Sequence, residues 1–370
     1  MTDNSESRAE HARRLLDDSL VIDALAGHFV APEPPPRNGK SFLERAIETG
    51  VNTVNITLAA HADSFDETLR TMFSYYCLID HQRDRALQVR SVSDIDRACA
   101  EGKLGFIFGT QYSGMVGGDT WRWTIMYELG LRIAQLTYNE RNVLGDGCRE
   151  PENRGLTAFG RQAVQEMNRL GIAIDISHTG ERTSLDAIAY SSRPVIASHS
   201  NARAISPSER NLADRTMLAI AESGGVMGLS PLSAMSFRAP GVRPTLSDYL
   251  DQFDYAIDLI GIDHVGVGTD LFESYTKISW ESSTKRMYPS AWIWETMYAD
   301  GFRFVEDWAR LVDGLIERGY SDDHIRQLLG GNWYRVLGQI WGPAQDSGPA
   351  RGWAAVLDTQ ALGAVNNPAG

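Results

Sequence analysis

The chain has 370 residues, of which 43% are hydrophobic and 22% are charged, a composition that excludes disordered and fibrous proteins. Its 35 Lys and Arg residues and 48 Asp and Glu residues give a formal net charge of −13, which disfavours nucleic acid and an anionic membrane as partners. No apolar run approaches the roughly 18 to 20 residues of a membrane-spanning helix, and residues 1–6 are too polar for a secretory signal, so we expect a cytoplasmic protein.

Eight short apolar or β-branched runs recur along the chain, each followed by a loop and then a stretch with helical periodicity. The predicted strands are residues 20–25, 51–58, 104–109, 131–137, 172–176, 194–197, 225–229 and 265–268. The predicted helices are residues 40–49, 66–76, 92–101, 121–129, 157–170, 182–190, 214–222 and 246–260. Eight strand–helix units predict an α/β fold, the (β/α)₈ TIM barrel. A doubly wound open sheet is the alternative, but no GxGxxG motif follows the first strand.

Three segments fall outside this pattern, the first of which is residues 31–36, a stiff, extended APEPPP run expected to route the chain over the barrel mouth. Residues 272–298, with Trp280, Trp292 and Trp294, form an aromatic insertion after the last predicted strand, and it suits a substrate lid, a subunit contact or plain packing equally. Residues 343–370 are rich in Gly, Ala and Pro, so we expect an arm or a poorly ordered tail. The sequence therefore predicts one barrel over residues 1–342.

Two histidines each end a predicted strand, and the strands are neighbours. His178 ends the fifth strand in DISH, and His199 ends the sixth in IASHS. Neighbouring barrel strands lie about 4.8 Å apart, so two such imidazoles can converge on one metal ion. Asp270 ends the eighth strand in GVGTD, where an aspartate can move a proton or cap a helix. These residues favour a metal site or acid–base chemistry at the carboxyl end of the barrel.

Six longer stretches carry a family resemblance. They are LTYNERNVLGDGC (136–148), GLTAFGRQAVQEMNRLGIAIDISHTG (155–180), RPVIASHSNARAISPSERNLAD (193–214), IAESGGVMGLS (220–230), DHVGVGTDLF (263–272) and LLGGNWYRVL (328–337). In these stretches the chain resembles the membrane (renal) dipeptidases, the M19 peptidases of the amidohydrolase type of barrel. The resemblance implies a homodimeric barrel in which two zinc ions activate a water that attacks the amide of a dipeptide.

The resemblance also implies roles for single residues. His178 and His199 match the ligands of the second zinc, and Asp270 matches the acid–base residue. Arg210 matches the arginine that binds the substrate carboxylate, and Asn201, in the same stretch, is a further predicted substrate contact. Tyr138 stands where the family usually has a substrate-polarising histidine, and a tyrosine can still donate a hydrogen bond to an oxyanion.

The first zinc site departs from the family pattern. The His-x-Asp pair that ends strand one in the family is matched by Leu25 and Gly27, neither of which binds metal. The bridging glutamate of the family is matched by Gln111, and a neutral amide does not offset two cations as a carboxylate does. His28, or His61 with Asp63, are possible replacement ligands on the same rim.

Three arrangements of the site therefore stay open. The first is one zinc ion on His178 and His199, with Gln111 or Asp270 and water completing the shell. The second is a rebuilt two-metal site, and the third is a site without metal. We expect a metal-dependent hydrolase of an amide or related C–N bond in a small carboxylate-bearing substrate. The alternatives are other chemistry in the same barrel, such as lactone opening, decarboxylation or isomerisation, and a ligand-binding pseudoenzyme.

Overall fold

A closed ring of parallel strands forms the centre of the molecule. The computed structural model describes residues 6–27, 36–239, 241–273 and 296–342. The strands are β1 (Ile22–Asp23), β2 (Thr53–Thr57), β3 (Ala86–Val89), β4 (Leu104–Thr110), β5 (Leu131–Gln135), β6 (Ala173–Asp175), β7 (Met227–Leu229) and β8 (Val265–Val267). One sheet has the order β1-β2-β4-β5-β6, with β3 also on β4, and β7 pairs with β8. All of these pairs are parallel.

Short parallel bridges close the ring between the two sheets. Ile196 pairs with Asp175 at the end of β6, and Ala197 pairs with Met227 in β7. On the other side, the N–H of Ala24 donates to the carbonyl of Val267 at 3.1 Å and joins β1 to β8. The eight predicted strands therefore occur in the predicted order, and the predicted (β/α)₈ barrel is confirmed. The predicted strand 194–197 is present as these two bridges.

The sequence interpretation missed β3. This strand pairs with Leu104–Ile107 of β4, beside the part of β4 that precedes its pairing with β5. Gln88 interrupts its short apolar run, so the segment resembles a loop in the sequence. β3 adds to the amino end of the barrel without changing the order of the eight predicted strands.

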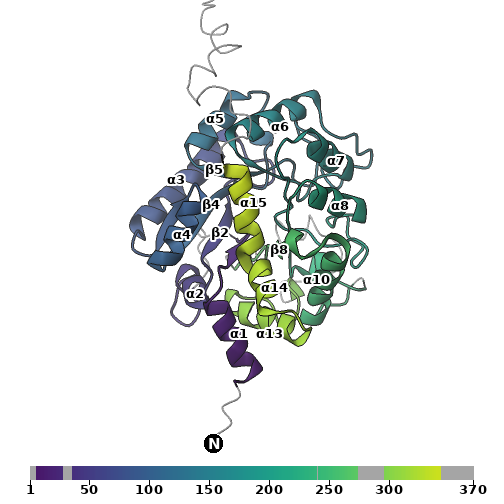
Figure 1. The fold of residues 1–370 in the computed structure, drawn as a ribbon. Coiled ribbons are helices and arrows are strands. Elements are labelled where there is room, and N and C mark those ends of the chain that lie inside the picture. Colours follow the sequence, from purple (N-terminus) through teal and green to yellow (C-terminus); the bar gives the residue numbers. More distant parts are fainter. Residues whose placement is uncertain (1–5, 28–35, 240, 274–295, 343–370) are drawn as a thin grey trace, which may run out of the picture.

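Helices surround the ring (Figure 1). They are α1 (Arg8–Asp17), α2 (Phe42–Thr49), α3 (Phe65–His81), α4 (Val92–Glu101), α5 (Trp121–Glu128), α6 (Ala158–Leu170), α7 (Glu181–Tyr190), α8 (Asp214–Glu222), α9 (Ser233–Ser236), α10 (Leu246–Ile260), α13 (Trp308–Glu317), α14 (Asp322–Arg326) and α15 (Asn332–Trp341). Local sequence fixes several ends. At α3, for example, Ser64 Oγ accepts the N–H of Glu67 and the Glu67 carboxylate accepts the N–H of Ser64, a capping box.

Helix α15 covers the amino end of the barrel and crosses the centre of Figure 1. Trp333 donates its indole N–H to the carbonyl of Val267, and Trp341 donates to the carbonyl of Arg132 at the start of β5. Arg193, just before the strand at residues 194–197, donates to the carbonyl of Ile340. Since α15 covers this end, a substrate has access to the barrel from the carboxyl ends of the strands, as in other barrel enzymes.

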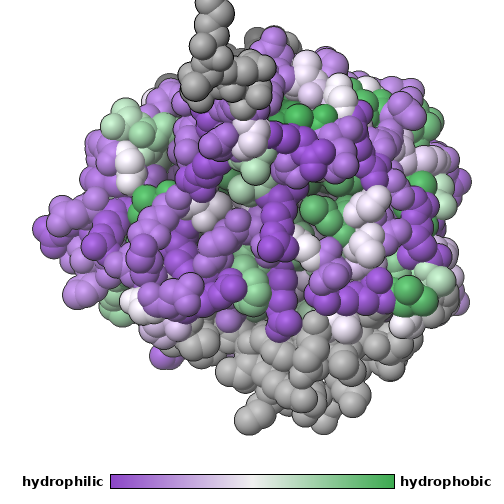
Figure 2. All heavy atoms as spheres, turned by 90° about the horizontal axis from the view of Figure 1, so that it is seen from below, coloured by the Kyte–Doolittle hydropathy of each residue, from purple (hydrophilic) through white to green (hydrophobic). Residues whose placement is uncertain are grey.

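The described part of the face seen from below is mainly polar. Figure 2 shows hydrophilic residues over most of the face seen from below, with hydrophobic residues in small areas between them. No helix among the described residues is both long and apolar enough to cross a membrane. Trp280, Trp292 and Trp294, which carry the predicted aromatic insertion, and the predicted tail 343–370 lie outside the described residues.

Candidate active site

Two histidines face each other at the carboxyl end of the barrel. His178 follows β6, and His199 follows the next strand of the ring, residues 194–197. Their Nε2 atoms lie 3.0 Å apart. Both side chains are buried, with 3% and 0% of their surface exposed. The structure thus brings together the two imidazoles that the strand order predicts to be neighbours.

The hydrogen bonds at the other ring nitrogens indicate where His178 carries its proton. His178 Nδ1 lies 2.7 Å from Oδ1 of Asn139. The Sγ of Cys148 donates to the same oxygen at 3.4 Å. An amide oxygen only accepts, so His178 donates from Nδ1. Burial first, and then the positive charge of Arg210, hold the pKa of His178 well below its usual range. The ring is therefore neutral and its Nε2 is bare.

This pair of nitrogens fits a metal ion. His199 is likewise buried next to Arg210, which lowers its pKa well below the usual range, so its ring is also neutral. Two nitrogen ligands that are each about 2.0 to 2.1 Å from one zinc ion lie less than about 4.2 Å apart, and the Nε2 atoms meet this condition. Among the described residues, no three His, Cys, Asp or Glu side chains gather into a metal-binding group. The two Nε2 atoms are therefore donors that an ion could bind, and the number of ions stays a prediction.

Gln111 lies one residue beyond β4 and is almost fully buried. Its Nε2 donates to Oγ1 of Thr57 in β2 at 2.9 Å, and its backbone N–H donates to the carbonyl of Ala59. These bonds hold the side chain at the carboxyl end of β2 and β4. Its role as a ligand stays a prediction.

Asp270 is a buried carboxyl group in an unusual environment. Its Oδ1 is buried and has no hydrogen-bond partner among the residues that the structure describes, which is rare for a polar atom. Burial raises the pKa of Asp270 to about 8, against the effect of Arg210 and with a further contribution from Asp23. The group can therefore hold a proton at neutral pH, as a general acid requires.

The backbone at the site is strained. Asn139, His178 and Asp270 have φ angles of 61°, 59° and 55°, in the left-handed region that favours glycine. Residues other than glycine are held in this region only where the surrounding structure stabilises them, and such residues cluster at functional sites.

A row of rings extends from the histidines to the rim. The ring of Tyr138 stacks on His178, with 4.2 Å between centroids, and His61 lies 5.8 Å from Tyr138. His61 is exposed. Asp63 is half-buried, and its Oδ2 accepts the N–H of Ala60 at 2.8 Å. His61 is thus near Tyr138 while Asp63 stabilises its own turn, and His28 lies outside the described residues.

Arg210 contacts the backbone that carries His199. Its guanidinium donates to the carbonyl of His199 at 2.8 Å and to Oγ of Ser200 at 3.1 Å. Asn201 is fully buried, and its Nδ2 donates to the carbonyls of Ser230 and Met235. Arg210 is therefore beside the histidine pair, whereas the amide of Asn201 holds the loop after β7. Substrate contact by either residue stays a prediction.

Comparison with known proteins identifies the family. Residues 38–289 match the family model described as membrane dipeptidase (peptidase family M19). The chain belongs to the membrane dipeptidase family. It is 26% identical to dipeptidase tcpJ of Claviceps purpurea over 82% of this chain and 67% of that protein. An amidohydrolase structure from Pseudomonas aeruginosa is 29% identical, covers 90% of this chain and 99% of its own, and has a TM-score of 0.80. A structure described as the dipeptidase AC, a metallo peptidase, is 25% identical over 88% and 99%, with a TM-score of 0.74.

In this membrane dipeptidase family member, the residues after β1 pack closely against the residues after β8. Leu25 is buried, and Ala26 pairs with Leu271. A Cβ at Gly27 would lie 2.2 Å from the carbonyl oxygen of Leu271 and 2.9 Å from Cα of Phe272. Gly27 thus has no room for a side chain in this conformation, and the loss of the first pair of ligands stays a prediction.

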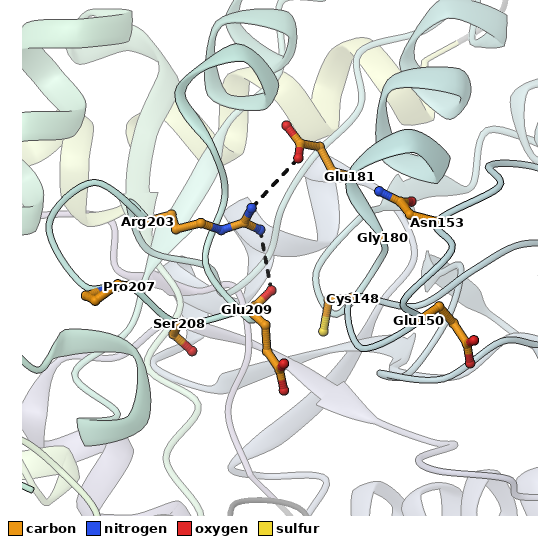
Figure 3. Close-up of a pocket in the computed structure, with 9 residues that line it drawn as sticks. All are labelled: Cys148, Glu150, Asn153, Gly180, Glu181, Arg203, Pro207, Ser208 and Glu209. Atoms are coloured by element: carbon orange, nitrogen blue, oxygen red, sulfur yellow. Dashed lines mark hydrogen bonds and ion pairs between the residues drawn. The ribbon is translucent and has the colours of Figure 1, made fainter. Parts of the chain in front are cut away.

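A surface pocket of about 250 Å³ is lined by residues that include Cys148, Arg203 and Glu209, and neither His178 nor His199 is among its lining residues. Figure 3 shows Arg203 between Glu181 and Glu209, with Cys148 across the pocket. Arg203 NH1 lies 3.8 Å from Glu181 Oε2, and Arg203 NH2 donates to the carbonyl of Glu209 at 3.5 Å. Because Arg203 is engaged in this way at the side of the barrel, Arg210 is the better placed of the two arginines for a ligand near His199.

Sequence reasoning missed the residues that form hydrogen bonds behind the two predicted metal ligands. Asn139 accepts from His178, while Asp175 and Ser198 lie behind His199. Their signal was present in the motifs DISH and ASHS, where Asp175 and Ser198 precede the two histidines. A single sequence does not reveal which polar residue at a strand end supports its neighbour.

Proposed function

We propose that this chain is a hydrolase of an amide or related C–N bond whose metal site holds one divalent ion, zinc by preference, on His178 and His199. The observation that carries the proposal is the pair of neutral, buried Nε2 atoms that face each other at 3.0 Å. When bound, a divalent ion supplies Lewis-acid polarisation of a carbonyl oxygen and activated water.

The proton transfer falls to Asp270. A carboxyl group whose pKa is raised to about 8 holds its proton at neutral pH and can give it to a leaving amine. Its unpartnered Oδ1 leaves an acceptor free for a substrate or a water molecule. The same carboxylate, once deprotonated, can take a proton from an attacking water.

Two further groups bind and orient the substrate. Arg210 presents a buried positive charge next to His199, and a guanidinium matches a carboxylate in two-pronged geometry. Tyr138, stacked on His178, can donate its hydroxyl to the oxyanion. A small carboxylate-bearing substrate such as a dipeptide suits this arrangement, in line with the names of tcpJ and other relatives.

A dipeptide panel tests this function directly. Purified protein with added zinc should hydrolyse at least one dipeptide, and Asp270→Asn and His178→Ala should each lower kcat/KM by about 10²- to 10⁴-fold. Arg203→Lys, at the side pocket, is the control and should retain the wild-type rate. Equal turnover by Asp270→Asn and the wild type would refute the assignment.

A further inference from the structure

Arg210 lies on a closed loop that follows the strand at residues 194–197. The two ends of the loop meet, because Ala202 pairs with Leu212 and the N–H of Arg203 donates to the carbonyl of Leu212 at 2.8 Å. We call residues 202–212 the Arg210 loop. Figure 3 shows the outer side of this loop beside the pocket.

A buried glutamine holds the Arg210 loop at two points. Gln252 lies in α10, one of the helices that surround the strands (Figure 1), and its side chain is fully buried. Its Oε1 accepts the N–H of Ala202 at 2.9 Å, and its Nε2 donates to Oγ of Ser206 at 3.0 Å. A backbone N–H only donates, so the bond to Ala202 fixes which end of the amide is the oxygen. Gln252 therefore links an outer helix to the loop.

The link continues to the residue next to Arg210. Asn211 is 1% exposed, and its Nδ2 donates to the carbonyl of Ser206 and to the carbonyl of Met235 in α9, both at 2.9 Å. Gln252 thus holds Ser206 by its hydroxyl, while Asn211 holds it by its carbonyl. A chain of hydrogen bonds runs from α10 through Ser206 and Asn211 to the backbone of Arg210.

The guanidinium of Arg210 lies in a defined orientation at the other end of this chain. Its bonds to the carbonyl of His199 and to Oγ of Ser200 use two of its five N–H groups. A carboxylate forms two parallel hydrogen bonds with a guanidinium only when the two groups are aligned. A shift of the loop should therefore weaken the binding of a carboxylate more than the binding of a neutral group.

We propose that Gln252 is a positioning residue, which holds the Arg210 loop so that the guanidinium is aligned with the carboxylate of the substrate. The link between α10 and the loop does not depend on the reaction, whereas its effect on the substrate rests on the proposed function. Gln252 bonds only the loop and none of the proposed catalytic groups. Its loss should therefore change KM rather than kcat.

Three substitutions separate positioning from stability. Gln252→Leu keeps about the same volume, removes both hydrogen bonds and leaves the buried N–H of Ala202 without its partner. Gln252→Glu is the conservative variant, since its carboxyl group can still accept this N–H and bond the hydroxyl of Ser206. Asn332→Leu is the matched control, because Asn332 is 2% exposed and its amide donates to two backbone carbonyls at the amino end of the barrel.

Hydrogen exchange of zinc-free protein, followed by mass spectrometry, tests the link itself. Gln252→Leu should speed exchange in residues 202–212 by about 10-fold or more, because the loop opens more easily. Asn332→Leu and Gln252→Glu should leave exchange in this loop as in the wild type. Ser206→Ala, which removes one oxygen atom, should also speed exchange, and it serves if Gln252→Leu does not fold. Unchanged exchange in residues 202–212 of the folded variants would overturn the proposal.

Steady-state kinetics on a dipeptide of the panel and on its carboxamide tests the effect on the substrate. Gln252→Leu should raise KM for the dipeptide by about 10-fold, with little change in kcat or in KM for the carboxamide. Gln252→Glu should restore most of the wild-type KM, and Asn332→Leu should change neither KM. An unchanged KM for the dipeptide in Gln252→Leu, or an equal rise for both substrates, would overturn the role of Gln252 toward the carboxylate.

The two measurements separate this proposal from the proposed function. If the wild type hydrolysed no dipeptide, the proposed function would be contradicted. Hydrogen exchange in residues 202–212 would then still decide whether Gln252 holds the Arg210 loop.

Discussion

The hydroxyl of Tyr298 donates to the backbone carbonyl of Asp270 at 2.5 Å and accepts the N–H of Phe272 at 2.8 Å. This tyrosine lies 28 residues after Asp270 and is buried. Asp270 has a φ of 55°, which an aspartate adopts only with outside support. Tyr298 therefore stabilises the strained turn that presents the Asp270 carboxyl group.

Tyr298→Phe should lower the free energy of unfolding by about 1 to 2 kcal/mol and also lower kcat, because it removes the hydroxyl that bonds the backbone of Asp270 and of Phe272 at the proposed acid–base residue. Tyr249→Phe is the control, since that hydroxyl donates to the carbonyl of Leu229 in an equally buried place. Chemical denaturation and steady-state kinetics on both variants measure this. A loss of kcat of the same size in both would assign the effect to stability alone.

The pH dependence of stability tests the state of Asp270. Its pKa is raised from 3.8 to about 8, so the folded protein binds this proton more tightly than the unfolded chain does. The free energy of unfolding therefore falls as pH rises from about 4 to about 8, and the group contributes its full stability only below about pH 4. In metal-free protein, Asp270→Asn should gain stability over the wild type progressively across this range. A difference between the two that is constant with pH would contradict the raised pKa.

Arg210→Lys should raise KM for a substrate with a free carboxylate by about 10- to 100-fold, since lysine keeps the charge but loses the two-pronged hydrogen bonds. The matching substrate with a carboxamide end should show little difference between wild type and variant. Arg203→Lys should leave both KM values unchanged. If Arg210→Lys raised KM equally for the carboxylate and the carboxamide, Arg210 would not be the carboxylate-binding residue.

The barrel was predictable because its signal repeats eight times. Each buried strand, such as residues 104–109, is an apolar run between loop signals, and the helices start at clear caps such as Ser64 with Glu67. One strand was missed, Ala86–Val89, because Gln88 interrupts its short apolar run and makes it resemble a loop. The strand predicted at 194–197 is present, although it pairs only through single bridges.

A substitution at Gly27 tests how closely the residues after β1 are packed. Gly27→Ala should lower the free energy of unfolding by about 1 to 3 kcal/mol, because the new Cβ would lie 2.2 Å from the Leu271 carbonyl oxygen. Gly118→Ala is the control, since a Cβ there meets nothing within 4 Å, and its effect should stay within about 0.5 kcal/mol. Thermal or chemical denaturation measures both. An equal effect at the two sites would contradict the close packing at Gly27.

The site was predictable only in part. The strand order predicted that His178 and His199 are neighbours, since each directly follows a strand and the strands are adjacent. The residues behind them were not predictable, because Asp175, Ser198 and Asn139 act through hydrogen bonds that depend on backbone angles. The left-handed φ of Asn139, for example, is one that asparagine tolerates but that its presence in the sequence does not specify.

Metal content per chain tests the central claim most directly. Protein purified without added metal or chelator, analysed by elemental analysis, should contain about one divalent ion per chain. The double variant His178→Ala, His199→Ala should contain close to none, while circular dichroism confirms that it is folded. A metal content that is the same in wild type and variant, or a wild type with no ion, would contradict a metal site on these two histidines.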